Sequence, residues 1–242
     1  MKIRAMLLAL TIAFLIPVLA FGQIAPYTQD FEGLTTAPEE GSSALGDDGW
    51  LYFVNVFNSS GVYLYGYGVG PAPNVGTHMS AVVEGEGGPD QEIKQLSIFS
   101  DYGNVGSHEA GDLIETNIFQ ELTIDASNVG QTWTMTFDAK LGNLEGATTA
   151  AAFIKTLDPN AGYATTNYIT ADMTSIPSDW GNYSVSLEID PSLAGQLFQI
   201  GFTNTAGNFE GSGVFYDNVN LSVDGAVATT STTLDNIKSL YR

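Results

Sequence analysis

The chain has 242 residues, of which 27 are acidic, only 7 are lysine or arginine, and none is cysteine. A surface this acidic repels nucleic acid and anionic membranes, so both are excluded as partners. Without cysteine there is no disulfide, zinc–thiolate site or cysteine nucleophile, and the fold relies on its core or on bound metal.

The N-terminal 22 residues have the order of a bacterial secretory signal. Lys2 and Arg4 precede an almost wholly apolar stretch, residues 6–19, and small residues follow it. We expect cleavage near residues 21–24 and export to the periplasm or medium, with an uncleaved N-terminal anchor as the alternative. The mature chain has 5 basic and 27 acidic side chains, a net charge of −22, and no second stretch long enough to span a membrane.

Short segments of alternating apolar and polar residues follow, separated by glycine-rich turns. Trp133, Met135 and Phe137, for example, alternate with threonines. Many short strands at this spacing predict one all-β domain over residues 23–224, a two-sheet antiparallel β-sandwich of jelly-roll type. Residues 225–242 are expected to be a C-terminal tail. In chain order, the candidate strands are 28–34, 50–56, 61–67, 78–83, 96–100, 117–124, 132–141, 151–157, 167–170, 183–189, 198–203 and 215–223.

Asp217 is the most informative residue for function. Two-residue alternation places it on the same strand face as Phe215, Val219 and Leu221, the predicted core face. A buried carboxylate is unfavourable unless it is paired or bound to a metal. With so few basic residues, a hard cation with oxygen ligands is the expected partner, and calcium suits a flexible oxygen cage. A strand end or backbone N–H donors would satisfy the carboxylate in another way.

Several short motifs resemble the jelly-roll carbohydrate-binding modules, galactose-binding-like β-sandwiches, of bacterial polysaccharide-degrading systems. They are Phe31-Glu32-Gly33, Phe119-Gln120-Glu121 with Gly130 and the strand 133–140, Trp180 with Tyr183, and Phe215-Tyr216-Asp217-Asn218-Val219. The resemblance covers about residues 27–224. It implies a polysaccharide or cell-surface glycan as partner, and a structural calcium packed between the first and last strands, with Glu32 and Asp217 as ligands.

Aromatic residues supply candidates for the sugar site, because sugars stack on aromatic rings beside amide and carboxylate groups. Tyr65 and Tyr67 share a predicted strand face with Tyr63, next to glycines, and Trp180 lies in a predicted loop. We take Tyr65, Tyr67 and Trp180 as candidate ligand-binding residues. Each of them could instead pack in the core or against a neighbouring strand, as aromatic residues commonly do in β-sandwiches.

The sequence favours a secreted, non-catalytic carbohydrate-binding module with a structural calcium. No catalytic residue is assigned, because the two histidines, His78 and His108, have no partner at metal spacing and no nucleophile elbow or phosphate loop is present. Two alternatives stay open: a structural or adhesive surface sandwich without a sugar site, and a polysaccharide lyase or hydrolase, which needs only two well-placed carboxylates. The sequence does not assign an oligomeric state.

Overall fold

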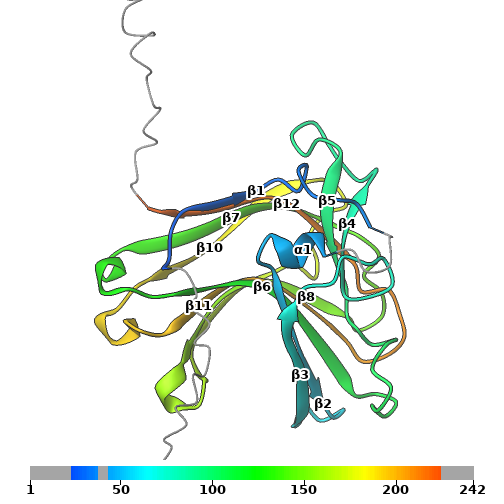
Figure 1. Ribbon diagram of the computed structural model, residues 1–242. Coiled ribbons are helices and arrows are strands. Elements are labelled where there is room, and N and C mark those ends of the chain that lie inside the picture. Colours follow the sequence, from blue (N-terminus) through cyan, green and yellow to red (C-terminus); the bar gives the residue numbers. More distant parts are fainter. Residues whose placement is uncertain (1–22, 38–42, 225–242) are drawn as a thin grey trace, which may run out of the picture.

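Alternating residues build a sandwich of two antiparallel sheets in the computed structural model, which describes residues 23–37 and 43–224 (Figure 1). The predicted signal segment, 1–22, and the predicted tail, 225–242, lie outside the described residues. Among the helices that are described, none is long and apolar enough to cross a membrane. The all-β, two-sheet prediction is confirmed.

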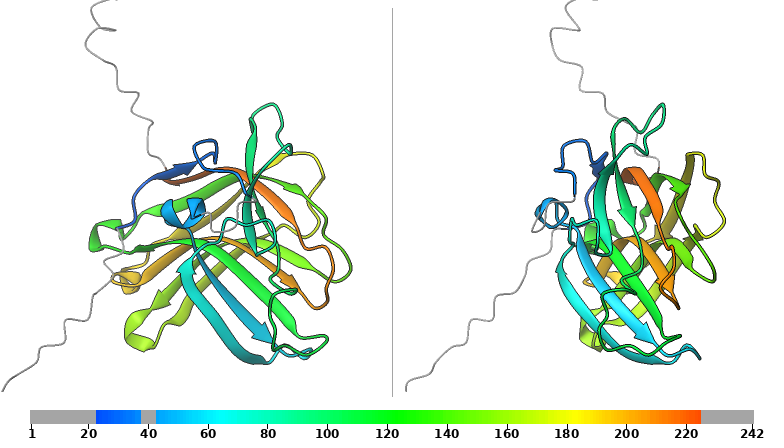
Figure 2. Two further views of the ribbon diagram at one scale, coloured as in Figure 1. Left: turned by 45° about the vertical axis from the view of Figure 1, so that its right-hand side comes forward. Right: turned by 90° about the vertical axis from the view of Figure 1, so that its right-hand side faces the viewer.

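Sheet A has six strands in a continuous order. Figure 2 shows its hairpins β2–β3, in blue to cyan, and β8–β9, in yellow-green, at opposite edges. Across the sheet the strands are β3 (Tyr63–Pro71), β2 (Leu51–Phe57), β6 (Leu113–Thr123), β11 (Leu197–Ala206), β8 (Thr149–Asp158) and β9 (Ala164–Asp172).

Sheet B faces it, and its short first strand joins its last, as a jelly roll requires (Figure 1). Three 3₁₀ turns and one four-residue helix connect the strands within the described chain. Sheet B runs β10 (Gly181–Glu188), β7 (Thr132–Leu141), β12 (Val214–Val223), β5 (Lys94–Ile98) and β4 (Ser80–Glu84), with β1 (Tyr27–Gln29) on β12; the helices are α1 (Ala44–Asp47), Ala126–Asn128, Pro159–Ala161 and Pro191–Leu193.

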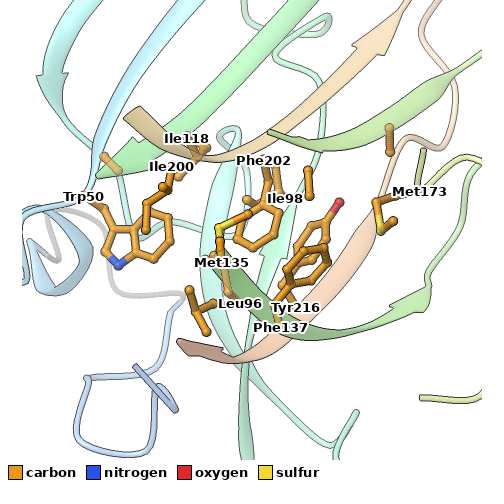
Figure 3. Close-up of a cluster of buried hydrophobic side chains, with 14 of the residues drawn as sticks. Trp50, Leu96, Ile98, Ile118, Met135, Phe137, Met173, Ile200, Phe202 and Tyr216 are labelled. Atoms are coloured by element: carbon orange, nitrogen blue, oxygen red, sulfur yellow. The ribbon is translucent and has the colours of Figure 1, made fainter. Parts of the chain in front are cut away.

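The core lies between the two sheets and is built around aromatic rings (Figure 3). Phe202 of β11 stacks on Tyr216 of β12 with ring centroids 3.8 Å apart, and Phe137 of β7 meets Phe202 edge-on at 5.2 Å. Trp50 closes the end near α1 and is fully buried. Because these rings come from both sheets, they fix which face of each strand points inward.

The candidate strands all overlap observed strands, but two segments differ. The predicted strand 28–34 ends at Gln29, because Phe31 takes a left-handed backbone conformation (φ 59°) that buries its ring and turns the chain. The segment before Trp50, expected to be a turn, contains the helix α1. Neither change affects the layer arrangement.

Bulges change the facing of two strands relative to simple alternation. In β12 the register with β7 shifts between Asp217 and Asn220, and Asn218 has a φ of 48°. The core face is therefore Val214, Tyr216, Val219 and Leu221, whereas Phe215 and Asp217 lie on the outer face of sheet B. The prediction that Asp217 points into the core was wrong in direction, although its burial was correct: Asp217 is 1% exposed.

The second bulge separates the three tyrosines of β3. Tyr65 pairs with Val56 and Tyr67 with Val54, both core-facing residues, so these two rings pack inward. The register shifts at Leu64, between Tyr63 and Tyr65, so Tyr63 lies on the outer face and is 53% exposed. The expectation of one shared tyrosine face was wrong for this reason.

Candidate functional site

The outer face of sheet A, the side turned away from the core, is lined by polar side chains at its centre. Strand register places Asn117 of β6 opposite Thr203 of β11, and Gln199 of β11 between Glu121 of β6 and Lys155 of β8. Side chains of residues paired across a ladder share a face. We call this surface the polar face.

Three of these buried polar side chains each have an oxygen without a hydrogen-bond partner in the described chain. Asn117, Gln199 and Thr203 are 1%, 4% and 6% exposed, yet Asn117 Oδ1, Gln199 Oε1 and Thr203 Oγ1 have no partner among the described residues. Buried polar atoms are nearly always paired, and an unpaired one destabilises the fold by about 1–3 kcal/mol. The face therefore has three buried oxygens whose hydrogen-bonding capacity the described chain does not satisfy.

Two carboxylates of β6, those of Glu115 and Glu121, extend the polar face. Asn55 and Asn117 each donate to Glu115 Oε1, at 2.7 and 3.1 Å, and Gln199 donates to Glu121 Oε2 at 2.6 Å. The second oxygen of each carboxylate has no hydrogen bond to any residue that the structure describes. Burial raises the pKa of Glu121, which Gln199 and Lys155 partly oppose. The amides thus hold both carboxylates in place with one free oxygen each.

Lys155 is the cation of the polar face. Its Nζ lies 5.1 Å from the ring centroid of Phe153 and 5.8 Å from that of Tyr168, and it makes no hydrogen bond or ion pair within the described chain. Burial lowers the pKa of Lys155, while Glu115 and Glu121 act to raise it. Its three N–H donors are free.

Aromatic rings stand around the polar centre. Tyr63 on β3 and Tyr168 on β9 are 53% and 45% exposed and lie at opposite edges of sheet A. Between them, Phe119 and Phe153 flank Gly201 in register. The ring of Phe53 lies over Gly66, whose absent side chain leaves the space. This combination of rings, amides and carboxylates is the chemistry by which proteins hold sugars.

A second cluster of polar residues lies on the outer face of sheet B around Asp217. Asp217 pairs in register with Asp138 of β7, and its Oδ1 accepts the backbone N–H of Asn218 at 2.6 Å. Its Oδ2 is buried without a partner. Burial chiefly raises the pKa of Asp217 to about 7, and the charges of Asp138, Glu32 and Asp30 add to the shift.

A loop between β4 and β5 covers this cluster. Gln91 in that loop donates to Asp138 Oδ2 at 2.7 Å, and Asn218 donates both to Asp138 Oδ2 and to the carbonyl of Asp90. The amide oxygens of Gln91 and Gln95 are also buried without a partner. Asp138 is therefore part of the Asp217 cluster.

Glu32, the second predicted calcium ligand, lies beside the start of β5. Its Oε1 accepts the backbone N–H groups of Ile93 and Lys94 at 2.7 and 2.6 Å, and Lys94 Nζ donates to the carbonyls of Glu32 and Leu34. The negative charge of Glu32 contributes to the raised pKa of Asp217. Within the described residues no three acidic or histidine side chains gather closely enough to hold a metal, so a cation here would need amide or carbonyl oxygens as well.

The structure does not bring the three predicted sugar-binding aromatics together. Tyr65 and Tyr67 lie on the inner side of β3, where their hydroxyls bond to Ser107 at 3.0 Å and to Asp101 at 2.6 Å. Trp180 lies at sheet B, where its indole N–H donates to the carbonyl of Glu86 at 2.9 Å. A sugar site at these three residues stays a prediction.

Trp180 has a second structural partner. Lys140 Nζ lies 5.5 Å from its ring centroid and forms an ion pair with Glu86 at 2.6 Å. The ring and the ammonium together hold the β4–β5 loop against sheet B.

The sequence analysis did not single out the polar face, although Gln199, Gly201 and Thr203 alternate visibly with apolar residues.

No protein-family model matches the chain, and no curated protein is similar to it in sequence. Solved structures of similar fold include a cyclase from Fischerella sp. TAU, with a TM-score of 0.45, 15% identity, and coverage of 84% of this chain and 100% of that chain. Another is the C-terminal family 22 carbohydrate-binding module of Clostridium thermocellum xylanase 10B, with a TM-score of 0.40, 13% identity, and coverage of 83% and 94%.

A third is the enzymatically active domain of bacteriophage CBA120 tailspike protein 4, with a TM-score of 0.42, 14% identity, and coverage of 72% of this chain. The chain spans only 19% of that protein and 27% of a two-module xylanase that it also matches. Carbohydrate-binding modules of several families are among the similar structures. None of these likenesses is close enough to assign a function to this chain.

Proposed function

We propose that this chain is a non-catalytic carbohydrate-binding protein and that its glycan lies on the polar face of sheet A. The observation that carries the proposal is the set of three buried, unpartnered oxygens on Asn117, Gln199 and Thr203. Sugar hydroxyls donate hydrogen bonds to such acceptors while their C–H faces stack on rings such as Tyr63 and Tyr168.

The length of the polar face suits a chain of sugar units rather than one unit. Glu115 and Glu121 stand six residues apart on one side of β6, which corresponds to roughly 20 Å in a β-strand. The unpartnered oxygens lie along the same stretch of sheet A. A ligand that contacts the whole row is therefore an oligosaccharide or a polysaccharide segment.

The carboxylates of the chain support binding better than hydrolysis. Glu115 and Glu121 are separated by far more than the roughly 5–9.5 Å between paired glycosidase carboxylates. Asp138 and Asp217 are adjacent, but the β4–β5 loop lies over them and is held to Asp138 by a hydrogen bond from Gln91. A purely structural or adhesive role would leave the unpartnered oxygens of the polar face unexplained.

We further propose a structural calcium at Asp217. Its support is the unpartnered Asp217 Oδ2, the unpartnered amide oxygens of Gln91 and Gln95 under the same loop, and the nearby charge of Glu32. Asp217 would bind the ion directly, and Glu32 would contribute through its free carboxylate oxygen. The ion would neutralise carboxylates that have no cationic side chain among their hydrogen-bond partners in the described chain.

The proposed setting is outside the cytoplasm. It follows from the predicted signal at residues 1–22, and a glycan-binding role and a calcium site both suit an exported protein. Intact-mass measurement of the exported protein, with a mass that starts at residues 21–24, is the expected result. A mass that includes Met1 would contradict it.

The binding proposal is tested by titrating the mature protein with a panel of neutral oligosaccharides. The panel includes the xylohexaose and β-1,4-galactotriose that two of the similar structures contain. We expect saturable binding of at least one member, weakened in a Gln199→Leu variant and unchanged in Tyr67→Phe and Trp180→Phe variants. Weakening in the last two alone would move the site to the aromatics predicted from sequence. If no member of the panel binds, the result favours the alternative of a structural or adhesive protein without a sugar site.

A further inference from the structure

The polar face has free acceptor oxygens at its two carboxylates and at two of its amides. One N–H of each of Asn55, Asn117 and Gln199 donates to Glu115 or Glu121. Each of these carboxylates keeps one free oxygen, and the buried amide oxygens of Asn117 and Gln199 are free as well. A ligand that uses these acceptors must donate hydrogen bonds to them, which hydroxyl and amine groups do and carboxylate or sulfate groups do not.

Lys155 is the cationic donor of the polar face. Three lysines lie within the described residues, and two of them are engaged: Lys94 donates to two carbonyls, and Lys140 pairs with Glu86. Lys155 alone among them contacts no oxygen, although it shares its face with two carboxylates. A partly buried ammonium with three unused donors is ready to bond an acceptor oxygen of a ligand.

We propose that Lys155 determines the specificity of the polar face by selecting neutral glycan chains over both acidic and amine-bearing ones. This inference rests on the proposed function and adds the substrate class and the residue that sets it. Lys155 donates to a hydroxyl or ring oxygen of a neutral sugar, while the free acceptors receive its hydroxyl protons.

Charge explains why both acidic and amine-bearing glycans would bind more weakly than neutral ones. An acidic sugar brings an acceptor-only group close to Glu115 and Glu121, whose two negative charges outweigh the single charge of Lys155. An amine-bearing sugar would suit these two carboxylates, but Lys155 places a like charge beside it. Specificity thus depends on repulsion as well as attraction. Removal of Lys155 should relax only the discrimination against amine-bearing sugars.

The test uses three β-1,4-linked hexamers that differ at one group per ring: cellohexaose, the glucosamine hexamer and the glucuronic acid hexamer. Titrations compare wild type with Lys155→Met and Lys155→Arg. We expect wild type to prefer cellohexaose. Lys155→Met should bind cellohexaose about 10- to 100-fold more weakly, the range of one hydrogen bond to a charged group, and should gain affinity for the glucosamine hexamer. Lys155→Arg should keep the wild-type order.

Other outcomes overturn the proposal. They are tighter binding of either charged hexamer by wild type, equal binding of cellohexaose by Lys155→Met, no gain for the glucosamine hexamer, or no binding of any hexamer. Thermal melting of each variant shows that it is folded. The two failures are distinguishable, because the proposed function fails only when no glycan of the wider neutral panel binds wild type.

Discussion

Asn117 of β6 and Thr203 of β11 lie directly opposite each other on the outer face of sheet A, and each carries a buried oxygen that has no hydrogen-bond partner in the described chain. Such atoms destabilise a fold, so a pair of them at adjacent positions needs an explanation outside the fold itself. A ligand that donates hydrogen bonds supplies one. This relationship leads to the account of the polar face as a glycan site.

Gly201 keeps the centre of the polar face flat. A Cβ at this position would lie 2.2 Å from the carbonyl oxygen of Ile118 and 2.7 Å from Cα of Phe119, both backbone atoms of β6. Gly201→Ala should therefore separate β6 from β11 and lower the free energy of unfolding by about 1–3 kcal/mol, the usual range for overpacking. Chemical denaturation checks this. Gly33→Ala is the control, since nothing lies within 4 Å of its Cβ position, and an equal loss there would contradict the explanation.

Chelation should lower the melting temperature if calcium binds at Asp217. Binding to the folded state alone adds about 2.7 kcal/mol when calcium is at 100 times its dissociation constant. We expect calcium, rather than magnesium, to restore the melting temperature of wild type, because magnesium dehydrates reluctantly. Asp217→Asn should show no response to either ion, measured by differential scanning calorimetry.

The control for this experiment is Glu188→Gln, on the exposed face of β10, which should respond as wild type does. Asp138 is unsuitable as a control, because it pairs in register with Asp217. Glu32→Gln should weaken the response, and it should also destabilise the chelated protein, since Glu32 Oε1 accepts two backbone N–H groups. A melting curve of wild type that chelator does not move, after confirmed metal removal, would rule out the calcium site.

The chelated protein should lose stability as pH rises from about 4 to about 7. The pKa of Asp217 is raised to about 7 from 3.8, so the folded chain holds this proton more tightly than the unfolded chain does. Unfolding then releases a proton in this window, and stability falls with rising pH, by at most about 4 kcal/mol in total.

A comparison with Asp217→Asn isolates this contribution. Asp172 and Asp190 have lowered pKa values and act in the opposite direction, but they do so equally in both proteins. The difference between the two melting temperatures should therefore shrink or reverse toward pH 4. Parallel pH profiles of the two proteins would show that Asp217 does not titrate as described.

Sequence reasoning predicted the two layers of the fold, but it did not predict on which face of its sheet every side chain lies. Alternation in residues 132–141 predicted β7 and the burial of Trp133, because β7 pairs with β10 without a register shift and its alternation is unbroken. The same rule failed at Asp217 and Tyr63, where a bulge shifts the parity by one residue. A bulge depends on contacts between strands distant in the sequence, so alternation within one strand does not reveal it.

Prediction of the candidate sites from the sequence was limited in a similar way. The sequence predicted that Asp217 is buried without a cationic partner, and the structure agrees. It did not predict the polar face, because Gln199 and Thr203 follow the pattern of an ordinary solvent-exposed strand face. The pairing of β11 with β6, which are far apart in the sequence, places Thr203 beside Asn117 and Gln199 beside Glu121.

The most direct test of the account is the substitution Thr203→Val, with both melting temperature and glycan affinity measured. Valine has the shape of threonine without the unpartnered hydroxyl, so the account predicts an unchanged or higher melting temperature together with weaker binding of the panel glycan. The matched control is Thr116→Val on the core side of β6, where the hydroxyl accepts the backbone N–H of Asp101 at 2.8 Å. This control should melt lower and bind as before. A Thr203→Val protein that binds the glycan as tightly as wild type would contradict the central claim.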